Sequence, residues 1–194
     1  MRDIIAILIV LTFVVRSVSV YSQNILMETD NHARFFLQSP SKNQIDVKYY
    51  SLQVYIDTQN KSIAGICEIH FFISTQSKNV NFDFTNQIKI NKILDKDGNI
   101  INFSHKNDKI IITGKDFNSL DSLNYLAIYY NGTPEEAFEP PWDGGFIWEE
   151  EVPFIGITCQ LEGASIWWPC NDRWDDKPDS MSINVIVPDS LMAI

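Results

Sequence analysis

Apolar and polar residues alternate along much of this chain, beginning near Asp46. In YYSLQVYID, positions 49–57, every second residue from Tyr50 to Ile56 is apolar. In SIAGICEIHFFIS, positions 62–74, the same holds from Ile63 to Ile73, with one glycine. Successive side chains of an extended strand point to opposite faces, so a period of two predicts two half-buried β-strands here. The intervening TQNK segment is typical of a turn.

Further short strands are predicted on the same grounds, and no convincing helical period precedes residue 130. They cover Asn79–Phe84, Ile88–Leu94, Ile100–Ser104, Lys109–Thr113 and Leu123–Tyr130. The segment DKDGN, Asp95–Asn99, predicts a hairpin turn because Asp-Gly favours the positive φ that such turns need. The predicted class is therefore all-β, an antiparallel β-sandwich or a saddle-like sheet.

The strand rhythm stops between residues 131 and 151, NGTPEEAFEPPWDGGFIWEEE, where prolines and glycines predict a long loop. A strand at Val152–Cys159 follows and leads into TCQLEGASIWWPCND, Thr158–Asp172, which mixes large aromatic and polar side chains. If this segment is a strand, Trp167 and Trp168 point to opposite faces, one to the core and one to an interface or cleft. Alternation returns at Met181–Asp189 and predicts a last strand.

The N-terminus has the features of an export signal. Arg2 precedes a run of about twelve mostly apolar residues, Ile4–Val15, and small and polar residues follow. That run is shorter than the roughly 20 residues of a membrane span and matches the apolar region of a secretory signal; the alternative is an apolar element of the fold. We expect a signal peptide at 1–22, cleaved after Ser22, an irregular leader at 23–45 and a β domain at 46–194. The protein is then periplasmic or extracellular, with no transmembrane span.

The formal net charge is −10, and it is concentrated in one region. Residues 23–134 hold 11 acidic and 11 basic side chains, whereas residues 135–179 hold 12 acidic and 2 basic ones. Nucleic acid is not an expected partner, because phosphate binding needs a basic patch. Most of these acidic groups are expected to form a solvated face. The alternative is a cleft that attracts a cation such as a free α-amine.

Three cysteines follow the expected signal peptide, and an odd number makes a poor disulfide framework. They are Cys67, Cys159 and Cys170. Cys159 and Cys170 could pair, but each lies in an apolar setting where a buried thiol acts as a small hydrophobe. We expect all three to pack as buried thiols.

No metal site is predicted within this chain. The histidines are isolated from one another: His32, His70 and His105. His70 lies in an alternating strand and His105 near a turn, so these two are expected at the surface. The aspartates Asp172, Asp175 and Asp176 do not have the spacing or the glycine of a calcium loop.

Tryptophans suggest a different kind of site, a stacking platform for sugars. They are Trp142, Trp148, Trp167, Trp168 and Trp174. Asn60, Asn102 and Asn131 lie in N-x-S/T sequons, which matter only in a eukaryotic secretory pathway.

One long segment resembles a known family. ITCQLEGASIWWPCNDRWDDKPDSMSINVIVPDSL is similar to a signature of the N-terminal β domain of the aminopeptidase N family of zinc metallopeptidases. The matching features are Gln160, the turn WWPCND, Lys177 and the strand INVIVP. The earlier YYSLQVYIDTQNKSIAGICEIHF resembles the opening hairpin of the family, and PPWDGGFIW resembles a loop of its secreted bacterial members. The resemblance extends from Asp46 to Ile194.

The resemblance implies a role for Gln160. In the family, a following catalytic domain holds zinc through a His-Glu-x-x-His helix and a later Glu, and carries a Gly-x-Met-Glu-Asn motif that binds the substrate amine. The β domain adds one Gln or Glu to the cleft, and Gln160 matches it. Gln160 would then line the first specificity pocket for peptides with a free N-terminus, as an acceptor without charge. The alternative is a polar residue at a strand end.

This chain lacks both catalytic motifs of the family. The resemblance therefore implies a β domain that is incomplete at its C-terminal end and inactive alone, with zinc bound by a catalytic domain not included in the sequence. Two hypotheses follow. The first is the substrate-cleft domain of an exported zinc aminopeptidase. The second is a stand-alone secreted β-sandwich that binds peptide or carbohydrate through the acidic, tryptophan-rich region.

Overall fold

The computed structural model describes residues 45–73, 79–113, 117, 122–149, 151, 154–173 and 175–194. Residues Asn43–Ile194 form one compact unit. The expected signal peptide at 1–22 and the expected leader at 23–45, except Ile45, lie outside the described residues and stay predictions. Among the described residues, no helix is long and apolar enough to cross a membrane.

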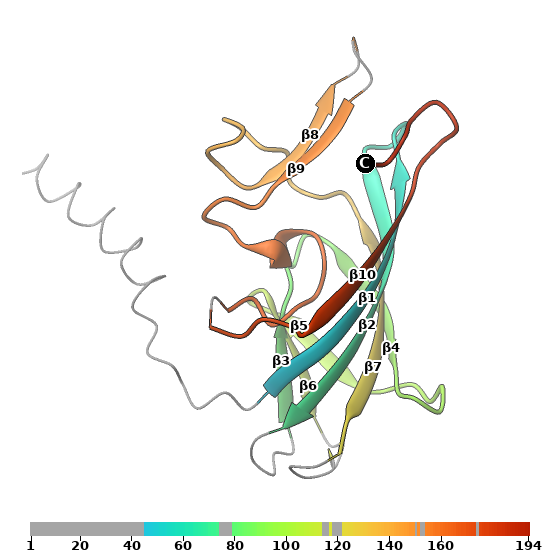
Figure 1. Ribbon diagram of the computed structural model, residues 1–194, viewed down its shortest axis with the longest axis vertical. Coiled ribbons are helices and arrows are strands. Elements are labelled where there is room, and N and C mark those ends of the chain that lie inside the picture. The colour runs from blue at the N-terminus through green and yellow to red at the C-terminus, as the bar shows by residue number, and fades with distance from the viewer. Residues whose placement is uncertain are drawn as a thin grey trace, which may run out of the picture. The chain divides into compact units, whose positions relative to one another are not determined.

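The described residues form strands arranged in three sheets, together with one short 3₁₀-helix at Ala164–Ile166. The strands are β1 (Ile45–Asp57), β2 (Ser62–Ile73), β3 (Asn79–Asp83), β4 (Lys89–Leu94), β5 (Phe103–Lys106), β6 (Lys109–Thr113), β7 (Asn124–Gly132), β8 (Gly145–Glu149), β9 (Phe154–Thr158) and β10 (Ser180–Ile186). One sheet has the order β10-β1-β2-β7-β4, the second has the order β3-β6-β5, and β8 pairs with β9. Figure 1 shows β3, β5 and β6 on one side of the larger sheet. The predicted all-β class is confirmed.

The alternation that predicted the first two strands matches their burial. In β1, Leu52 and Val54 are buried, and in β2 Cys67, Ile69 and Phe71 are fully buried. The two strands pair antiparallel, with Leu52 opposite Cys67. This register places both apolar sets on the same face of the sheet, where a shift of one residue would expose one of them.

The hydrophobic core lies between the larger and the smaller sheet. Phe71 of β2 meets Phe82 of β3 edge to face, with ring centroids 5.5 Å apart. Phe84, just after β3, meets Tyr130 of β7 at 5.1 Å. Ile110 of β6 is fully buried. Burial of a side chain of this size contributes about 1.5–3 kcal/mol to the free energy of unfolding, so these contacts hold the two sheets together.

The predicted hairpin turn at Asp95–Asn99 is confirmed. The Asp95 N–H donates to the Asn99 carbonyl and the Gly98 N–H donates to the Asp95 carbonyl, both at 3.0 Å. Gly98 has a φ of 82°, a conformation that glycine adopts without the cost that a Cβ imposes. The turn connects β4 of the larger sheet to the chain that enters β5 of the smaller one.

Two predictions about the region after β7 are wrong. The segment predicted as one long loop contains strand β8, because Phe146 and its neighbours pair with β9 and Phe146 is buried. The adjacent Trp167 and Trp168 do not lie in a strand but follow the 3₁₀-helix Ala164–Ile166. Both rings pack on the core, Trp168 as a buried residue and Trp167 as a half-buried one, so neither is turned away toward a cleft.

The last strand also differs from its prediction. β10 ends at Ile186, before the predicted end at Asp189, and it pairs with β1 in parallel. The remaining strand pairs among the described residues are antiparallel. A hairpin cannot join two parallel neighbours, and the chain from β1 to β10 accordingly passes through all the other described strands before it returns beside β1.

Candidate functional site

The loop between β7 and β8 presents two aromatic side chains to solvent. Phe138 is 89% exposed and Trp142 is 67% exposed. The Asp143 carboxylate holds this loop, because it accepts the backbone N–H of Phe138 at 2.6 Å and that of Glu139 at 3.0 Å. The Trp142 N–H donates to the Glu139 carbonyl at 2.8 Å. The two aromatic side chains are therefore exposed on a loop fixed by its own hydrogen bonds.

Strand β8 attaches this loop to the core. Phe146 is 1% exposed; its ring stacks on Trp148 with centroids 5.3 Å apart and meets Trp167 edge to face at 6.4 Å. Gly145 has a φ of 144°, and a Cβ there would lie 2.5 Å from the Ala137 nitrogen. Position 145 therefore requires glycine. Its close packing on Ala137 fixes the start of β8 against the β7–β8 loop.

Gln160 lies in an exposed turn that follows β9. The Cys159 carbonyl accepts the Gly163 N–H at 3.0 Å and closes the turn. The Thr158 hydroxyl donates to the Pro141 carbonyl at 3.1 Å. This bond joins the end of β9, two residues before Gln160, to the β7–β8 loop.

The segment after this turn is attached to both sheets. Asp83 at the end of β3 exchanges backbone hydrogen bonds with Cys170, at 2.7 and 3.0 Å. The Asn171 N–H donates to the Tyr50 hydroxyl of β1 at 2.9 Å, and the Tyr50 ring meets Trp168 at 4.8 Å. The tryptophan-rich stretch therefore has a fixed base at 163–172 and an exposed tip at 159–162.

The three cysteines do not pair with one another, and they differ in exposure. Cys67 and Cys170 are buried free thiols, as predicted, whereas Cys159 is exposed. The prediction for Cys159 is wrong because this residue follows the end of β9 and lies in the turn, outside the core. Burial raises the pKa of Cys67 and of Cys170 well above the usual value, and desolvation also raises the pKa of Cys159. All three therefore stay protonated at neutral pH, unlike an activated nucleophile.

The described residues contain no group of three or more His, Cys, Asp or Glu side chains placed to hold a metal ion. His32 lies outside the described residues. His70 and His105 are half-buried, which corrects the expectation of surface positions. The His70 ring lies against Tyr125 at 5.1 Å, and His105 Nε2 lies 2.9 Å from the Phe84 carbonyl, so each is held by neighbours of its own.

Asp172, Asp175 and Asp176 of the acidic region each bind a different group of the chain. Asp172 accepts a backbone N–H at 2.9 Å. Asp175 binds the Arg173 guanidinium through both oxygens at 2.9 Å, and this hydrogen bonding lowers the pKa of Asp175. Asp176 accepts the side-chain amide of Asn171, and burial raises its pKa. These contacts stabilise the chain itself and give calcium no support.

The tryptophans also divide by position. Trp142 is exposed, Trp148 and Trp167 are half-buried, and Trp168 is buried, while Trp174 lies outside the described residues. A platform of several tryptophans is therefore not formed by the four that are described. The exposed aromatic residue that accompanies Trp142 in the β7–β8 loop is Phe138, which the sequence patterns did not single out. The Asp143 contacts that fix Phe138 have no signal in a single sequence.

Comparison with solved structures identifies the fold. An M1 zinc metallopeptidase from Deinococcus radiodurans, in a mutant form bound to a Tyr-Ser-Ala substrate, matches with a TM-score of 0.62 and 18% identity, over 75% of this chain and 33% of that chain. Another structure of the M1 zinc metallopeptidase from Deinococcus radiodurans matches with a TM-score of 0.61 and 17% identity, over 79% and 35%. A two-domain M1 zinc metallopeptidase mutant bound to L-tryptophan matches with a TM-score of 0.62 and 18% identity, over 75% and 33%.

No family model matches the sequence, and no curated protein matches it either. The chain spans about a third of the length of the matching structures. This all-β unit therefore shares its fold with part of the M1 zinc metallopeptidases.

Proposed function

We propose that this chain is the N-terminal, substrate-cleft domain of an exported zinc aminopeptidase that removes N-terminal residues from peptides. The observation that carries the proposal is the position of Gln160. It is an exposed amide on a closed turn, and the base of that turn is bonded to both sheets of a fold shared with M1 zinc metallopeptidases. A residue that contacts substrate needs this combination of access and a rigid support.

In this proposal the Gln160 amide oxygen accepts a hydrogen bond from the free α-amine of a peptide. The surrounding charge supports the same role. Residues 135–179 hold 12 acidic and 2 basic side chains, and a surface with one sign of charge attracts oppositely charged ligands. Glu162, in the same exposed turn, packs against Gly144 of the β7–β8 loop. The acidic turn and loop would steer the ammonium group of the peptide toward Gln160.

Zinc chemistry needs residues other than the described ones, because these hold no metal-binding group of side chains. The proposal assigns zinc, and the water that it activates, to a separate catalytic domain. This chain then binds and orients the peptide N-terminus. It also shields one side of the cleft from water.

The test uses the product of the complete gene, including any sequence that follows codon 194. We expect zinc bound to the purified protein and hydrolysis of aminoacyl p-nitroanilides but not of their N-acetylated forms. Gln160→Ala should lower kcat/KM about tenfold, mainly through KM, because one hydrogen bond to a charged group is lost. Gln160→Glu, unlike Gln160→Ala, should keep the activity of the parent protein, since a carboxylate binds the ammonium group more strongly.

Gln59→Ala is the matched control, because Gln59 is also an exposed glutamine in a turn. It should leave kcat/KM unchanged. The proposed role is wrong if Gln160→Ala changes neither turnover nor the preference for a free amine. The enzyme proposal is wrong if the complete protein binds no zinc and cleaves no peptide.

The second candidate is a stand-alone binding module for peptide or carbohydrate. The exposure of Phe138 at 89% and of Trp142 at 67% favours it, because exposed aromatic side chains on a fixed loop are suited to stacking on a ligand. Saturable binding by this chain alone, lost in Trp142→Ala and kept in Tyr55→Ala, would support it. Tyr55 is a suitable control because it is 44% exposed and lies in β1.

A further inference from the structure

The turn that carries Gln160 ends against a carboxylate. The Gly163 N–H closes this turn by donating to the Cys159 carbonyl at 3.0 Å. A Cβ added to Gly163 would overlap the carboxylate of Asp172, so the backbone of Gly163 lies directly on that group. Gly163 also has a φ of 84°, in the left-handed region where a residue with a Cβ is strained. The end of the turn is therefore packed tightly on Asp172.

The same carboxylate binds the backbone two residues farther along the chain. Asp172 Oδ2 accepts the Ser165 N–H at 2.9 Å. Ser165 lies in the 3₁₀-helix Ala164–Ile166, and Gly163 before that helix makes no side-chain capping bond, although the first N–H groups of a helix lack acceptors within it. Asp172 supplies an acceptor from elsewhere in the chain, and a charged acceptor binds an N–H more strongly than a neutral one.

Asp172 is attached in turn to the smaller sheet. Its N–H donates to Asp83 Oδ2 at 3.1 Å. Asp83 ends β3, and the other oxygen of its carboxylate pairs with Lys109 of β6. The Asp83 side chain is 17% exposed, so water competes little for these bonds. Asp172 therefore has a fixed place from which its carboxylate can hold the turn.

The helix that contains Ser165 has a second attachment, to the segment after β3. The Ser165 carbonyl accepts the Thr85 N–H at 2.9 Å. The residues on either side of Thr85 are held by Asp108 of the β5–β6 turn. Its carbonyl accepts the Phe84 N–H at 3.0 Å, and its carboxylate accepts the Asn86 N–H at 2.7 Å. Both backbone groups of Ser165 are consequently bound, one by Asp172 and the other by Thr85.

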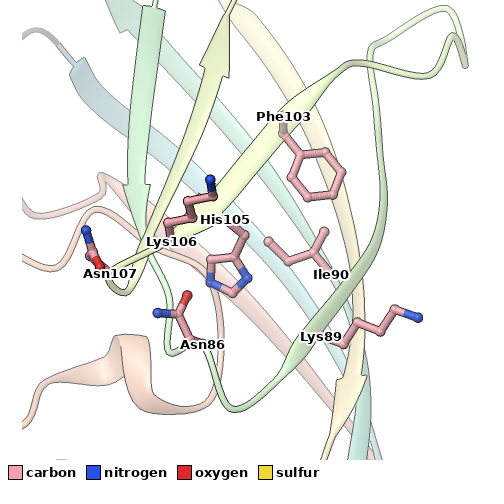
Figure 2. A pocket seen from close by; sticks show the side chains of 7 residues that line it. All are labelled: Asn86, Lys89, Ile90, Phe103, His105, Lys106 and Asn107. Atoms are coloured by element: carbon pink, nitrogen blue, oxygen red, sulfur yellow. The ribbon is translucent and has the colours of Figure 1, made fainter.

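Strand β5 also supports this segment, beside a pocket. Figure 2 shows Asn86 and His105 at a pocket of about 490 Å³, which lies where β4 and β5, the last strands of their sheets, separate. His105 Nε2 donates to the Phe84 carbonyl at 2.9 Å, since a carbonyl can only accept, and the two rings stack with centroids 5.6 Å apart. The segment that binds Ser165 is therefore held in place although open space lies next to it.

We propose that Asp172 is the positioning residue for Gln160. Its carboxylate fixes the end of the turn through Gly163 and Ser165, and the Gln160 amide consequently keeps one orientation toward the α-amine of a peptide. The inference rests on the proposed function, to which it adds a residue that does not touch the peptide. Loss of this carboxylate should loosen the turn without removing any group that binds the amine.

The first test follows the turn itself through the thiol of Cys159, which is exposed and lies at its start. Asp172→Ala and Asp172→Asn are compared in the full chain. Both remove the negative charge, which adds to the larger effect of desolvation in raising the pKa of Cys159, but only asparagine keeps the volume and an oxygen that can accept the Ser165 N–H. We expect dithionitrobenzoate to label Cys159 about threefold faster in Asp172→Ala than in Asp172→Asn, because a loosened turn exposes the thiol more often.

Asp175→Ala is the matched control, because Asp175 lies in the same acidic region but binds Arg173 rather than the turn. It should leave the labelling rate of the parent chain unchanged. One equivalent of label in each variant will show that Cys67 and Cys170 stay buried and the variant is folded. If Asp172→Ala does not fold, hydrogen exchange of the Ser165 amide replaces the labelling. In the parent chain and in Asp172→Asn this amide should exchange at least about tenfold more slowly than in an unfolded peptide.

The second test uses the product of the complete gene and aminoacyl p-nitroanilides. Asp172→Ala should lower kcat/KM about fivefold, mainly through KM, and Asp172→Asn should retain most of the activity. The double variant Asp172→Ala/Gln160→Ala should be no less active than Gln160→Ala, because a residue that acts through Gln160 then has nothing to position. A residue that only stabilises the fold would lower the activity of the double variant further.

The proposal is overturned if Asp172→Ala and Asp172→Asn label Cys159 at equal rates, if the Ser165 amide exchanges as in an unfolded peptide, or if the effects of the two substitutions on kcat/KM multiply. A complete protein that binds no zinc and cleaves no peptide would contradict the proposed function instead. The labelling comparison separates the two failures, because it needs no peptidase activity.

Discussion

The Tyr50 hydroxyl accepts a hydrogen bond from the backbone N–H of Asn171 at 2.9 Å. Tyr50 belongs to the first strand and is 3% exposed. Asn171 belongs to the base of the segment whose tip carries Gln160. One buried side chain therefore connects the larger sheet to the candidate site, and it uses both its hydroxyl group and its ring, which meets Trp168 at 4.8 Å.

Replacing Tyr50 by Phe should lower the free energy of unfolding by about 1–3 kcal/mol. The ring contacts remain, but the Asn171 N–H loses its acceptor in a partly buried position, and an unsatisfied buried donor costs this much. Urea unfolding followed by tryptophan fluorescence measures the loss. Tyr55→Phe is the matched control, since Tyr55 is 44% exposed, and should change stability by less than about 0.5 kcal/mol. Equal effects of the two variants would contradict the role given to Tyr50.

Gly163 is expected to tolerate alanine much less than Gly98 does. Gly163 has φ 84° and ψ −179°, a region that only glycine adopts readily, and an added Cβ would overlap the Asp172 carboxylate. Gly98 has a φ of 82°, but an added Cβ would meet nothing within 4 Å. We expect losses of about 1 kcal/mol for Gly98→Ala and about 3 kcal/mol or more for Gly163→Ala, measured by urea unfolding. Similar losses would show that the Asp172 contact is unimportant.

Thiol labelling should distinguish the three cysteines. In the folded protein, one equivalent of a thiol reagent such as dithionitrobenzoate should react, at Cys159, because Cys67 and Cys170 are buried; in urea all three should react. The raised pKa of Cys159 lowers its thiolate fraction at pH 7, so labelling should be slower than that of a free cysteine peptide and should accelerate as pH rises. Cys159→Ser should abolish the folded-state reaction. Labelling of the folded Cys159→Ser variant would contradict the burial of the other two.

The edge strand β10 should cause self-association. Ile183 is 53% exposed and Val185 is 40% exposed, although they stand opposite the buried Leu52 and Val54 of β1. Among the described strands, β10 has a neighbour on one side only, and an apolar edge strand favours pairing with another chain. Sedimentation should show concentration-dependent association that Ile183→Lys abolishes and Ser190→Lys, in the exposed segment after β10, retains. A wild-type chain that remains monomeric at every concentration would contradict this prediction.

Local patterns predicted the two long strands and their core faces. The alternation in β1 and β2 matches their burial residue by residue, and Asp-Gly located the turn before Ile100. Strand β8 was missed because prolines and glycines precede it closely, at Pro140, Pro141 and Gly144, and these turn residues outweighed the five residues of the strand. The pairing of β10 with β1 joins residues far apart in sequence, for which a single sequence contains no local signal.

The sequence indicated which residues form the candidate site, but not how they are arranged in space. The segment from Thr158 to Asp172 was singled out by its composition, with Gln160 named through a family resemblance. The division into a fixed base and an exposed tip depends on long-range bonds, such as Asp83 with Cys170. The exposure of Phe138 depends on its contact with Asp143. The pocket beside His105 arises from the divergence of two sheets, which follows from the assembled topology.

The place of β10 beside β1 has a consequence for how the domain is made. Of the described strands, β1 and β2 leave the ribosome first, and these two can pair at once as a hairpin. The partner on the other side of β1 is Ser180–Ile186, which is translated after the other described strands. At typical translation rates, roughly 5–20 residues per second, that edge of β1 stays bare for on the order of ten seconds. Among the described strands, β1 is therefore made first and is the last to gain both of its neighbours, and during this interval its edge is open to a chaperone or a neighbouring chain.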